Sequence, residues 1–468
     1  MDTEELPVSN LPPEYAKFLA TKAPVAIPVG IEPCPMPAHL FDFQANVTAF
    51  ALRQGRAAMF LDTGMGKTRI QLEWAKQAAA ASNGWALILT PLAVARQIER
   101  EGLALGYDCR VIREMEDAGP GINICNYDRL DKLHPERFGA VLLDESSVLK
   151  SFTGATTRAL IAAFRDHRFK LCATATPAPN DHMELGQHAE FLSIMASNEM
   201  LARWFMSDQT EMGRYRLKGH GEAAFWDWMA SWARCAETPA DLGYDASKFV
   251  LPPLNVIRHA VAGDIRPAAG SLFVEDMSAT NIHNIKRQTA DARADAVAGL
   301  IAAEPDEAWL IWCDTDYEAD ALKARIAGCV EVRGSQTPER KETALIGFAT
   351  GDVQIMVTKP GIAGMGMNYQ RCARMAFVGR SFSYESWYQA VRRCWRFGQT
   401  RPVDVHIAVA EGEEQIGRVI TRKAEGHSKM KRAMASAMKR ALGQSAIVKV
   451  PYNPAYIGRL PSWLKSAA

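Results

Sequence analysis

The chain has 468 residues, of which 48% are hydrophobic and 23% are charged, as is typical of a folded protein with two or three domains. Its formal net charge of +1 excludes a strongly basic overall surface, so a site for a polyanion has to be a local cleft. No apolar run approaches the roughly 20 residues that a membrane-spanning helix needs, and the acidic residues 1–5 do not resemble a signal peptide. The nine cysteines show no C-x-x-C spacing, so we expect reduced thiols, a cytoplasmic location and no contact with a membrane.

The first third of the chain contains a pattern typical of nucleotide binding. Residues 1–38 are rich in proline, which predicts an extended arm with one short helix around residues 15–21. A helix-like stretch over residues 47–52 leads into the apolar run 57–60, and another helix-forming stretch begins at residue 69. Between them lies LDTGMGKT, residues 61–68, which predicts a strand, a phosphate-binding loop and a helix.

In such a loop, glycines allow backbone N–H groups to turn inward around an anion, and the positive end of the following helix adds its field. We expect Lys67 to reach the β- and γ-phosphates and the hydroxyl of Thr68 to bind Mg²⁺, with no other metal site in the chain. The residues expected to surround the phosphates are Thr63, Gly64, Met65 and Gly66. A chance glycine-rich turn is the alternative, but the flanking strand and helix favour the phosphate loop. Kinases, switches and motors share such loops, so the loop alone does not identify the reaction.

Four further apolar runs follow at the spacing of a βαβ series, at residues 86–89, 122–125, 140–143 and 171–173. Each ends where polar residues begin, and such residues line the ligand crevice of an open parallel sheet. Asp144 and Glu145 follow the third run. Across from a phosphate loop, Asp144 is expected to hold Mg²⁺ through water, and Glu145 to orient and deprotonate the attacking water.

Residues 196–260 interrupt this rhythm and predict a mainly helical insertion. Its tryptophans could stack on nucleic-acid bases, but aromatic residues at helical spacing favour a core position. They are Trp204, Trp226, Trp228 and Trp232. A second βαβ series predicts another α/β lobe without a phosphate loop of its own, with apolar runs at residues 308–312, 329–332, 353–357, 375–378 and 403–407.

The segment from residue 411 to the end is basic and helix-prone. Met430, Met434 and Met438 recur every four residues and therefore lie on one helical face. Two interpretations remain open: a surface helix that packs its methionines on the second lobe, or a helix that contacts a phosphate backbone.

The second lobe contains the segment QAVRRCWRFGQ, residues 389–399. Arg393 and Arg396 are three residues apart, so on a helix both project from one face. Two guanidinium groups presented together suit the γ-phosphate of a nucleotide held by the other lobe. Arginine fingers of this kind raise the rate by about 10³- to 10⁵-fold.

The order of these motifs resembles the ATPases of helicase superfamily two, specifically the Swi/Snf-related, DEAD/DEAH-box helicase-like branch. The similarity covers residues 40 to about 411 and rests, in chain order, on Gln44, GMGKT, TPLAV, DESS, TATP, TKPGIAGMGMN and QAVRRCWRFGQ. The lead-in LFDFQ, the Trp-rich insertion and the stretch PADLGY are similar to compact members found in bacteriophages and prophages.

The resemblance implies two RecA-like lobes of the P-loop NTPase fold, with ATP and Mg²⁺ at their interface. It implies that Gln44 contacts adenine and that Gln389 couples the lobes. Gly364 and Gly366 are implied as further nucleotide-binding residues. The residues implied to track the DNA backbone are Thr90, Pro91, Asn126, Thr176, Lys359 and Gly364. Contacts to phosphates carry no sequence information, as a translocating motor requires.

Two residues depart from the family pattern. Ser147 stands where the acidic motif usually ends in histidine, and Trp395 replaces a common histidine between the two arginines. Neither change removes a catalytic group. We therefore expect the two changes to affect the coupling between hydrolysis and the second lobe more than the hydrolysis itself.

The sequence therefore predicts an ATP hydrolase that translocates on DNA, with duplex favoured over single strands and RNA. The alternatives are a strand-separating DNA or RNA helicase, the motor subunit of a restriction or modification complex, and a nucleotide-binding scaffold without turnover. A protein partner in replication, recombination or modification is compatible with each motor. The expected domains are the arm 1–38, lobe one 39–195, the insertion 196–260, lobe two 261–410 and a basic helical tail 411–468.

Overall fold

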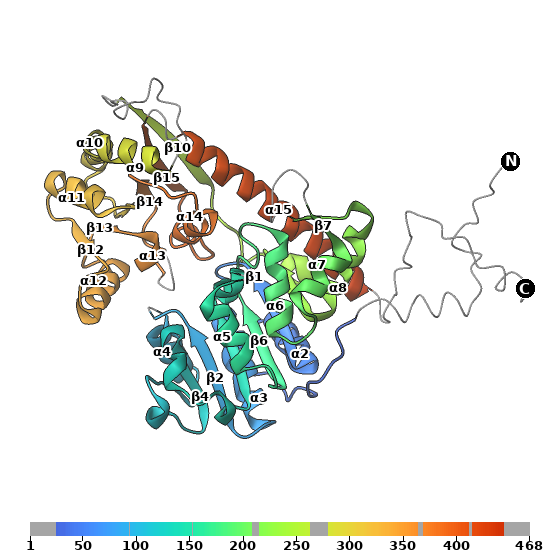
Figure 1. Ribbon diagram of the computed structural model, residues 1–468. Coiled ribbons are helices and arrows are strands. Elements are labelled where there is room, and N and C mark those ends of the chain that lie inside the picture. The colour runs from blue at the N-terminus through green and yellow to red at the C-terminus, as the bar shows by residue number, and fades with distance from the viewer. Residues whose placement is uncertain are drawn as a thin grey trace, which may run out of the picture.

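The computed structural model describes residues 25–92, 94–151, 153–207, 215–262, 279–363, 368–410 and 414–443. Two parallel sheets, each flanked by helices, form two α/β lobes, and a short antiparallel ribbon lies beside the first (Figure 1). The predicted α/β class with two RecA-like lobes is confirmed. No helix within these ranges is both long and apolar enough to span a bilayer.

The first lobe is built on a seven-stranded sheet in the order β3-β4-β2-β5-β6-β1-β9. The strands of this sheet are β1 (Arg56–Leu61), β2 (Trp85–Thr90), β3 (Cys109–Val111), β4 (Gly121–Asn126), β5 (Ala140–Asp144), β6 (Phe169–Ala173) and β9 (Ala233–Ala236). Its helices are α2 (Asp42–Gln54), α3 (Lys67–Ala80), α4 (Ala95–Ala104), α5 (Ala155–Ala163), α6 (Leu185–Phe191), α7 (Ser197–Trp204) and α8 (Glu222–Trp232). The ribbon pairs β7 (Phe205–Ser207) with β8 (Tyr215–Leu217). Strands covered on both faces need continuous apolar runs, and every residue of β5 and β6 is buried.

The second lobe is built on a six-stranded sheet in the order β10-β15-β14-β11-β13-β12. The strands are β10 (Leu254–Val261), β11 (Trp309–Trp312), β12 (Val330–Val332), β13 (Ile355–Thr358), β14 (Arg374–Phe377) and β15 (Val403–Ala410). The helices are α9 (Ala279–Gln288), α10 (Ala290–Ala303), α11 (Asp316–Arg325), α12 (Pro338–Thr350), α13 (Pro360–Ala363) and α14 (Tyr384–Val391). Glu318 forms a capping box with Thr315 at the start of α11 and also pairs with Arg293 of α10 at 2.8 Å, with both side chains fully buried. The capping box satisfies N–H groups at the start of α11, and the ion pair gives each of the two buried charges a partner.

Five strands lie in residues where the sequence predicted none: β3, β7, β8, β9 and β10. β9, within the expected insertion, pairs with β1 and extends the first sheet. β10 pairs with β15 over eight residues and forms an edge of the second sheet. The insertion thus contains a strand of the first lobe, and the second lobe begins before residue 261. The insertion tryptophans are core residues, as predicted: Trp204, Trp226, Trp228 and Trp232 are each 4% exposed or less.

The described part of the tail forms one long helix, α15 (Glu414–Gly443), that runs from the second lobe back to the first (Figure 1). Its methionines do not pack on the second lobe. Met430, Met434 and Met438 are buried in the core cluster of the first lobe, against α8 and β9. Arg440 pairs with Asp227 of α8 at 2.7 Å and adds a polar anchor at the same end.

The described part of the N-terminal arm lies on the first lobe. The N–H groups of Val29, Gly30 and Ile31 donate to the last carbonyls of α2, at 2.9 to 3.1 Å. These carbonyls lack partners within the helix, so the arm caps the C-terminal end of α2. The short helix expected around residues 15–21 lies outside the described residues.

Candidate ATP site between the two lobes

The phosphate loop joins β1 to α3, as the sequence predicts. Gly64 and Gly66 have φ angles of 91° and 75°, in the left-handed region that favours glycine. Both glycines also permit close contacts. A Cβ atom at Gly66 would lie 2.2 Å from Nε2 of Gln44, and one at Gly64 would lie 2.9 Å from a ring carbon of Phe397 in the second lobe. The loop therefore requires glycine for its own conformation and for the approach of the other lobe.

Gln44 connects the start of α2 to this loop. The side chain is 2% exposed, its Nε2 donates to the carbonyl of Met65 at 2.9 Å, and its Oε1 accepts from the N–H of Phe41 at 3.0 Å. Among the hydrogen bonds of the described residues, this leaves one N–H of Nε2 for adenine. The adenine contact stays a prediction.

Lys67 is the first residue of α3, and its ammonium group lies among acidic groups. Nζ donates to the carbonyl of Leu61 at 3.0 Å and contacts that of Asp62 at 3.5 Å. Burial lowers the pKa of Lys67, while the carboxylates of Glu145, Asp62 and Asp144 favour its charged form. Thr68 follows at the second position of the helix.

Asp144 closes β5 with a fixed carboxylate. Its Oδ1 accepts from Nε2 of Gln71 at 2.6 Å, and its Oδ2 accepts from the hydroxyl of Thr90 at 2.9 Å. The hydroxyl of Tyr127 donates to its main-chain carbonyl at 2.6 Å. Carboxylate and hydroxyl oxygens are the ligands that Mg²⁺ prefers, so Asp144 and Thr68 fit the metal that accompanies ATP.

Glu145 has a backbone conformation that is rare for a residue with a side chain. Its φ of 52° is positive, and among the described residues only Ser193 shares this feature outside glycine. Such conformations cluster at functional sites because the surrounding structure has to hold them. The hydroxyl of Thr174 donates to Oε2 of Glu145 at 3.2 Å. Burial and the neighbouring Asp144 raise the pKa of Glu145, although Lys67 and Arg393 oppose the rise. A raised pKa suits a carboxylate that accepts a proton from water.

Arg393 and Arg396 do not share a helical face, in contrast to the prediction. Helix α14 ends at Val391. The reason is that the carbonyl of Arg393 accepts from the N–H of Tyr369 at 3.0 Å, so the chain turns where a helix would continue. Both arginines therefore lie in a turn that the neighbouring loop fixes.

The structure brings Arg393 to the acidic residues of the first lobe. Its guanidinium group is buried, which lowers its pKa, and the charges of Glu145 and Asp144 favour the charged form. Arg396 donates instead to the side chain of Asn368 in its own lobe. Burial lowers the pKa of Arg396 to about 9, and the positive charges of Arg393 and Arg392 add to this effect.

Arg392, which sequence reasoning did not single out, makes the direct contacts with the phosphate loop. It is 1% exposed, pairs with Asp62 at 3.2 Å and donates to the carbonyl of Thr63 at 2.9 Å. Its guanidinium lies 4.9 Å from the ring centroid of Trp395. Trp395 in turn donates its indole N–H to the carbonyl of Pro252, before β10, at 2.7 Å. The tryptophan that departs from the family pattern thus supports the arginine that joins the lobes.

A second contact joins the lobes beside the acidic motif. Lys150, in the turn that follows Glu145, pairs with Glu385 of α14 at 2.5 Å. Ser147 is buried in the same turn. Gln389, implied to couple the lobes, lies on α14, and its carbonyl accepts from Nε of Arg393 at 3.3 Å.

The residues implied to contact DNA are placed in two ways. Thr90 and Thr176 are fully buried, and the hydroxyl of Thr90 is engaged by Asp144. Pro91 and Asn126 are half-buried at the ends of β2 and β4. Lys359 follows β13 and pairs with Asp316 at 2.9 Å. Gly364 and Gly366 lie outside the described residues.

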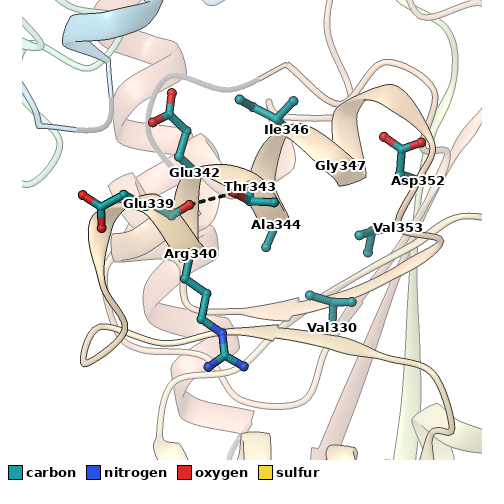
Figure 2. A pocket seen from close by; sticks show the side chains of 10 residues that line it. All are labelled: Val330, Glu339, Arg340, Glu342, Thr343, Ala344, Ile346, Gly347, Asp352 and Val353. Carbon is teal, nitrogen blue, oxygen red and sulfur yellow. Dashed lines mark hydrogen bonds between the residues drawn. The ribbon is translucent and has the colours of Figure 1, made fainter.

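A hollow of about 760 Å³ lies on the second lobe along α12, away from the residues described above (Figure 2). Its lining combines the acidic Glu339, Glu342 and Asp352 with Arg340 and small apolar side chains. It contains none of the predicted site residues, so it does not contribute to the candidate ATP site.

Comparisons with known proteins agree with the second-lobe motifs. A protein-family model described as the helicase conserved C-terminal domain matches residues 292–398. Chromodomain-helicase-DNA-binding protein 1-like from Danio rerio is 34% identical over 90 residues, which are 19% of this chain and 9% of that protein. DNA annealing helicase and endonuclease ZRANB3 from Mus musculus is 23% identical over 443 residues, which cover 82% of this chain and 40% of that protein.

The chain therefore spans less than half the length of either curated relative. Among solved structures, the Sulfolobus solfataricus SWI2/SNF2 ATPase core in complex with dsDNA has 17% sequence identity and a TM-score of 0.40, with 89% of this chain and 97% of that one covered. The domain match and the similarity to ZRANB3 over most of the chain agree with the resemblance of the motifs to the Swi/Snf-related branch of helicase superfamily two.

Proposed function

We propose that this chain hydrolyses ATP between its two lobes and uses the cycle to move along duplex DNA without separating the strands. The observation that supports the proposal is that the buried Arg393 of the second lobe is close enough to Glu145 and Asp144 of the first for their charges to interact. A site divided between two lobes makes hydrolysis depend on how the lobes meet, as a motor needs.

In this mechanism the phosphate loop and Lys67 hold the β- and γ-phosphates. Glu145 takes a proton from the attacking water, while Arg393 stabilises the charge on the γ-phosphoryl group, with Arg396 as the second finger. Asp144 and Thr68 would hold the Mg²⁺ that accompanies ATP, which would neutralise charge on the phosphates. Release of phosphate removes the anion that both lobes contact, so the lobes separate and the grip on DNA shifts.

The choice of DNA is supported by the relatives, whose names describe a DNA-binding helicase and a DNA annealing helicase. Duplex tracking follows from the Swi/Snf-like form of the motifs TKPGIAGMGMN and QAVRRCWRFGQ. Contacts to phosphates through the half-buried Asn126 and Lys359 would not depend on sequence. We further propose a cytoplasmic location and, from the lead-in LFDFQ and the stretch PADLGY, a compact bacteriophage-type member.

A comparison of ATP turnover with duplex DNA, single-stranded DNA and RNA at one salt concentration tests the proposal. We expect duplex DNA to stimulate turnover most. With ATP, the chain should displace the third strand of a DNA triplex on a blunt duplex, whereas with a non-hydrolysable analogue it should not. Release of a strand from a tailed duplex would instead favour the strand-separating helicase, and tight ATP binding without turnover under all conditions would favour a scaffold.

A second set of phosphate contacts is expected on the tail helix. A hollow of about 470 Å³ lies beside the tail helix, and Glu425 is the one acidic residue in its lining. The lining also includes three arginines: Arg258 of β10, Arg380, which precedes α14, and Arg432 of α15. Replacing both Arg258 and Arg432 with alanine should reduce the slope of log affinity against log salt by about two, because each phosphate contact contributes about one. Turnover without DNA should be unchanged.

Lys439→Ala is the matched control, since Lys439 is exposed on the same helix but does not line this hollow. The measurement is DNA affinity at several salt concentrations for the three proteins. An equal slope in the double variant and the wild type would show that the hollow does not contact DNA.

A further inference from the structure

Lys431 of the tail helix reaches the phosphate loop of the first lobe. Its side chain is 2% exposed, and Nζ lies 3.7 Å from Oδ2 of Asp62, the residue that precedes Thr63 of the loop. Nζ also donates to the hydroxyl of Tyr388 at 3.3 Å and lies 3.5 Å from Glu237, which follows β9. One ammonium group thus contacts the first lobe and α14 of the second lobe at the same time.

Asp62 is the shared acceptor in this cluster. Besides Lys431, its carboxylate contacts Arg392 at 3.2 Å and accepts from the hydroxyl of Tyr388 and from the N–H of Thr63, the latter at 2.6 Å. Burial alone would raise the pKa of Asp62, but Lys431 and Arg392 lower it to about 2, so Asp62 stays ionised. Burial disfavours the charged form of Lys431, yet Asp62, Tyr388 and Glu237 raise its pKa overall.

The contact between Lys431 and Tyr388 gives the ammonium group a directing role. Because Lys431 donates to the Tyr388 oxygen, the hydroxyl hydrogen of Tyr388 is free to point at Asp62. Tyr388 immediately precedes Gln389 in the chain, and Arg392 immediately precedes Arg393. The orientation of these two side chains therefore sets where the arginine-bearing turn meets the phosphate loop.

The neighbours of Lys431 on α15 pack in the core of the first lobe and fix its position. The flanking Met430 and Met434 are 1% and 2% exposed within the core of that lobe. One helical turn earlier, His427 packs on the rings of Tyr384 and Tyr388, at 5.4 and 5.8 Å between centroids. A buried charge without a partner is strongly unfavourable, so the position of Lys431 among these apolar side chains depends on its pairing with Asp62 and Glu237.

We infer that Lys431 is a positioning residue for ATP hydrolysis: through Asp62 and Tyr388 it holds the arginine-bearing turn of the second lobe against the phosphate loop. The role rests on the proposed hydrolysis at the lobe interface. It also assigns the tail helix a part in the reaction, in addition to its packing on the first lobe.

Replacing Lys431 with methionine tests the inference, because methionine keeps much of the side-chain length and removes the charge. We expect kcat for ATP to fall about tenfold, the loss of one hydrogen bond to a charged group, with KM for ATP little changed. Lys431→Arg should restore most of the rate. In an Asp62→Asn background, the methionine variant should have almost no further effect, since both changes disrupt one cluster.

Arg440→Ala is the matched control. Arg440 anchors the same helix to the same lobe through Asp227, but it lies far from the phosphate loop along α15. The variant should retain wild-type kcat. A methionine variant with wild-type kcat, or with an undiminished effect in the Asp62→Asn background, would overturn the inference.

Small-angle X-ray scattering provides a readout that does not need turnover. The lobes of the Lys431→Met variant should lie farther apart on average, with a larger radius of gyration than the wild type and the Arg440→Ala control. If the wild-type protein showed no ATP hydrolysis, that result would contradict the proposed function. The scattering comparison would still decide the role of Lys431, and an unchanged radius of gyration would then refute it.

Discussion

Replacing Arg393 or Arg396 with alanine is expected to reduce ATP turnover by about 10³- to 10⁵-fold, the range known for arginine fingers. Nucleotide affinity should change little, because the phosphate loop binds most of the nucleotide. The buried guanidinium group of Arg393 is within electrostatic range of Glu145 and Asp144, so this variant tests the composite site most directly. Arg396 donates to Asn368 in the present arrangement, and we expect it to turn toward the phosphates when ATP is bound.

The rate of hydrolysis is measured under single-turnover conditions, and nucleotide affinity is measured with a fluorescent ATP analogue. Lys67→Ala should instead lose affinity for the phosphates together with turnover. Arg401→Ala serves as the control, since Arg401 is 46% exposed and pairs with Glu307 at 2.5 Å outside the site. Near-normal turnover in both finger variants would argue against hydrolysis at the lobe interface.

Glu145→Gln is expected to lower kcat by about 10²- to 10⁴-fold, the usual contribution of a general base. Glutamine keeps the shape and the contact with Thr174 but cannot accept a proton. ATP binding should persist, because the phosphates are held by the loop and Lys67. Rapid-quench measurement of the hydrolysis step, compared with ATP affinity, gives both quantities.

The pH dependence of the wild-type enzyme provides a second test of Glu145. The base works only when it is ionised, and burial, together with Asp144, raises its pKa. Activity should therefore fall with decreasing pH sooner than an ordinary glutamate would allow. A kcat that stays constant down to the pH at which a solvent-exposed glutamate titrates would assign proton transfer to another group.

Most of the sheet architecture could be predicted because buried parallel strands are continuous apolar runs. The runs 86–89, 140–143 and 171–173 became β2, β5 and β6. β9 escaped prediction because its four residues follow α8 directly, with no turn residue to mark a boundary. β10 was missed because most of its residues are exposed, so polar side chains interrupt the apolar pattern.

The candidate site was predictable where chemistry and position coincide. Three residues show this: Lys67 ends the phosphate loop, and Asp144 and Glu145 stand at the end of β5. Their lysine, aspartate and glutamate side chains all fit the hydrolysis of a nucleotide. Arg392 could not be distinguished from Arg393 by type or spacing, because its role depends on Asp62, which is 330 residues earlier in the chain. The helix that would have placed Arg393 and Arg396 on one face ends early because of a carbonyl contact with Tyr369, and no local pattern encodes that contact.

The path of the chain between the lobes has a mechanical consequence. The chain crosses from the first lobe to the second after β9, and α15 returns it to the core beside β9 and α8. A body attached to another at two points can rotate freely only about the line that joins them. The two crossings should thus convert the opening of the lobes into a hinge motion with a single axis. Under the proposed function, each ATP would then displace the second lobe along a fixed arc.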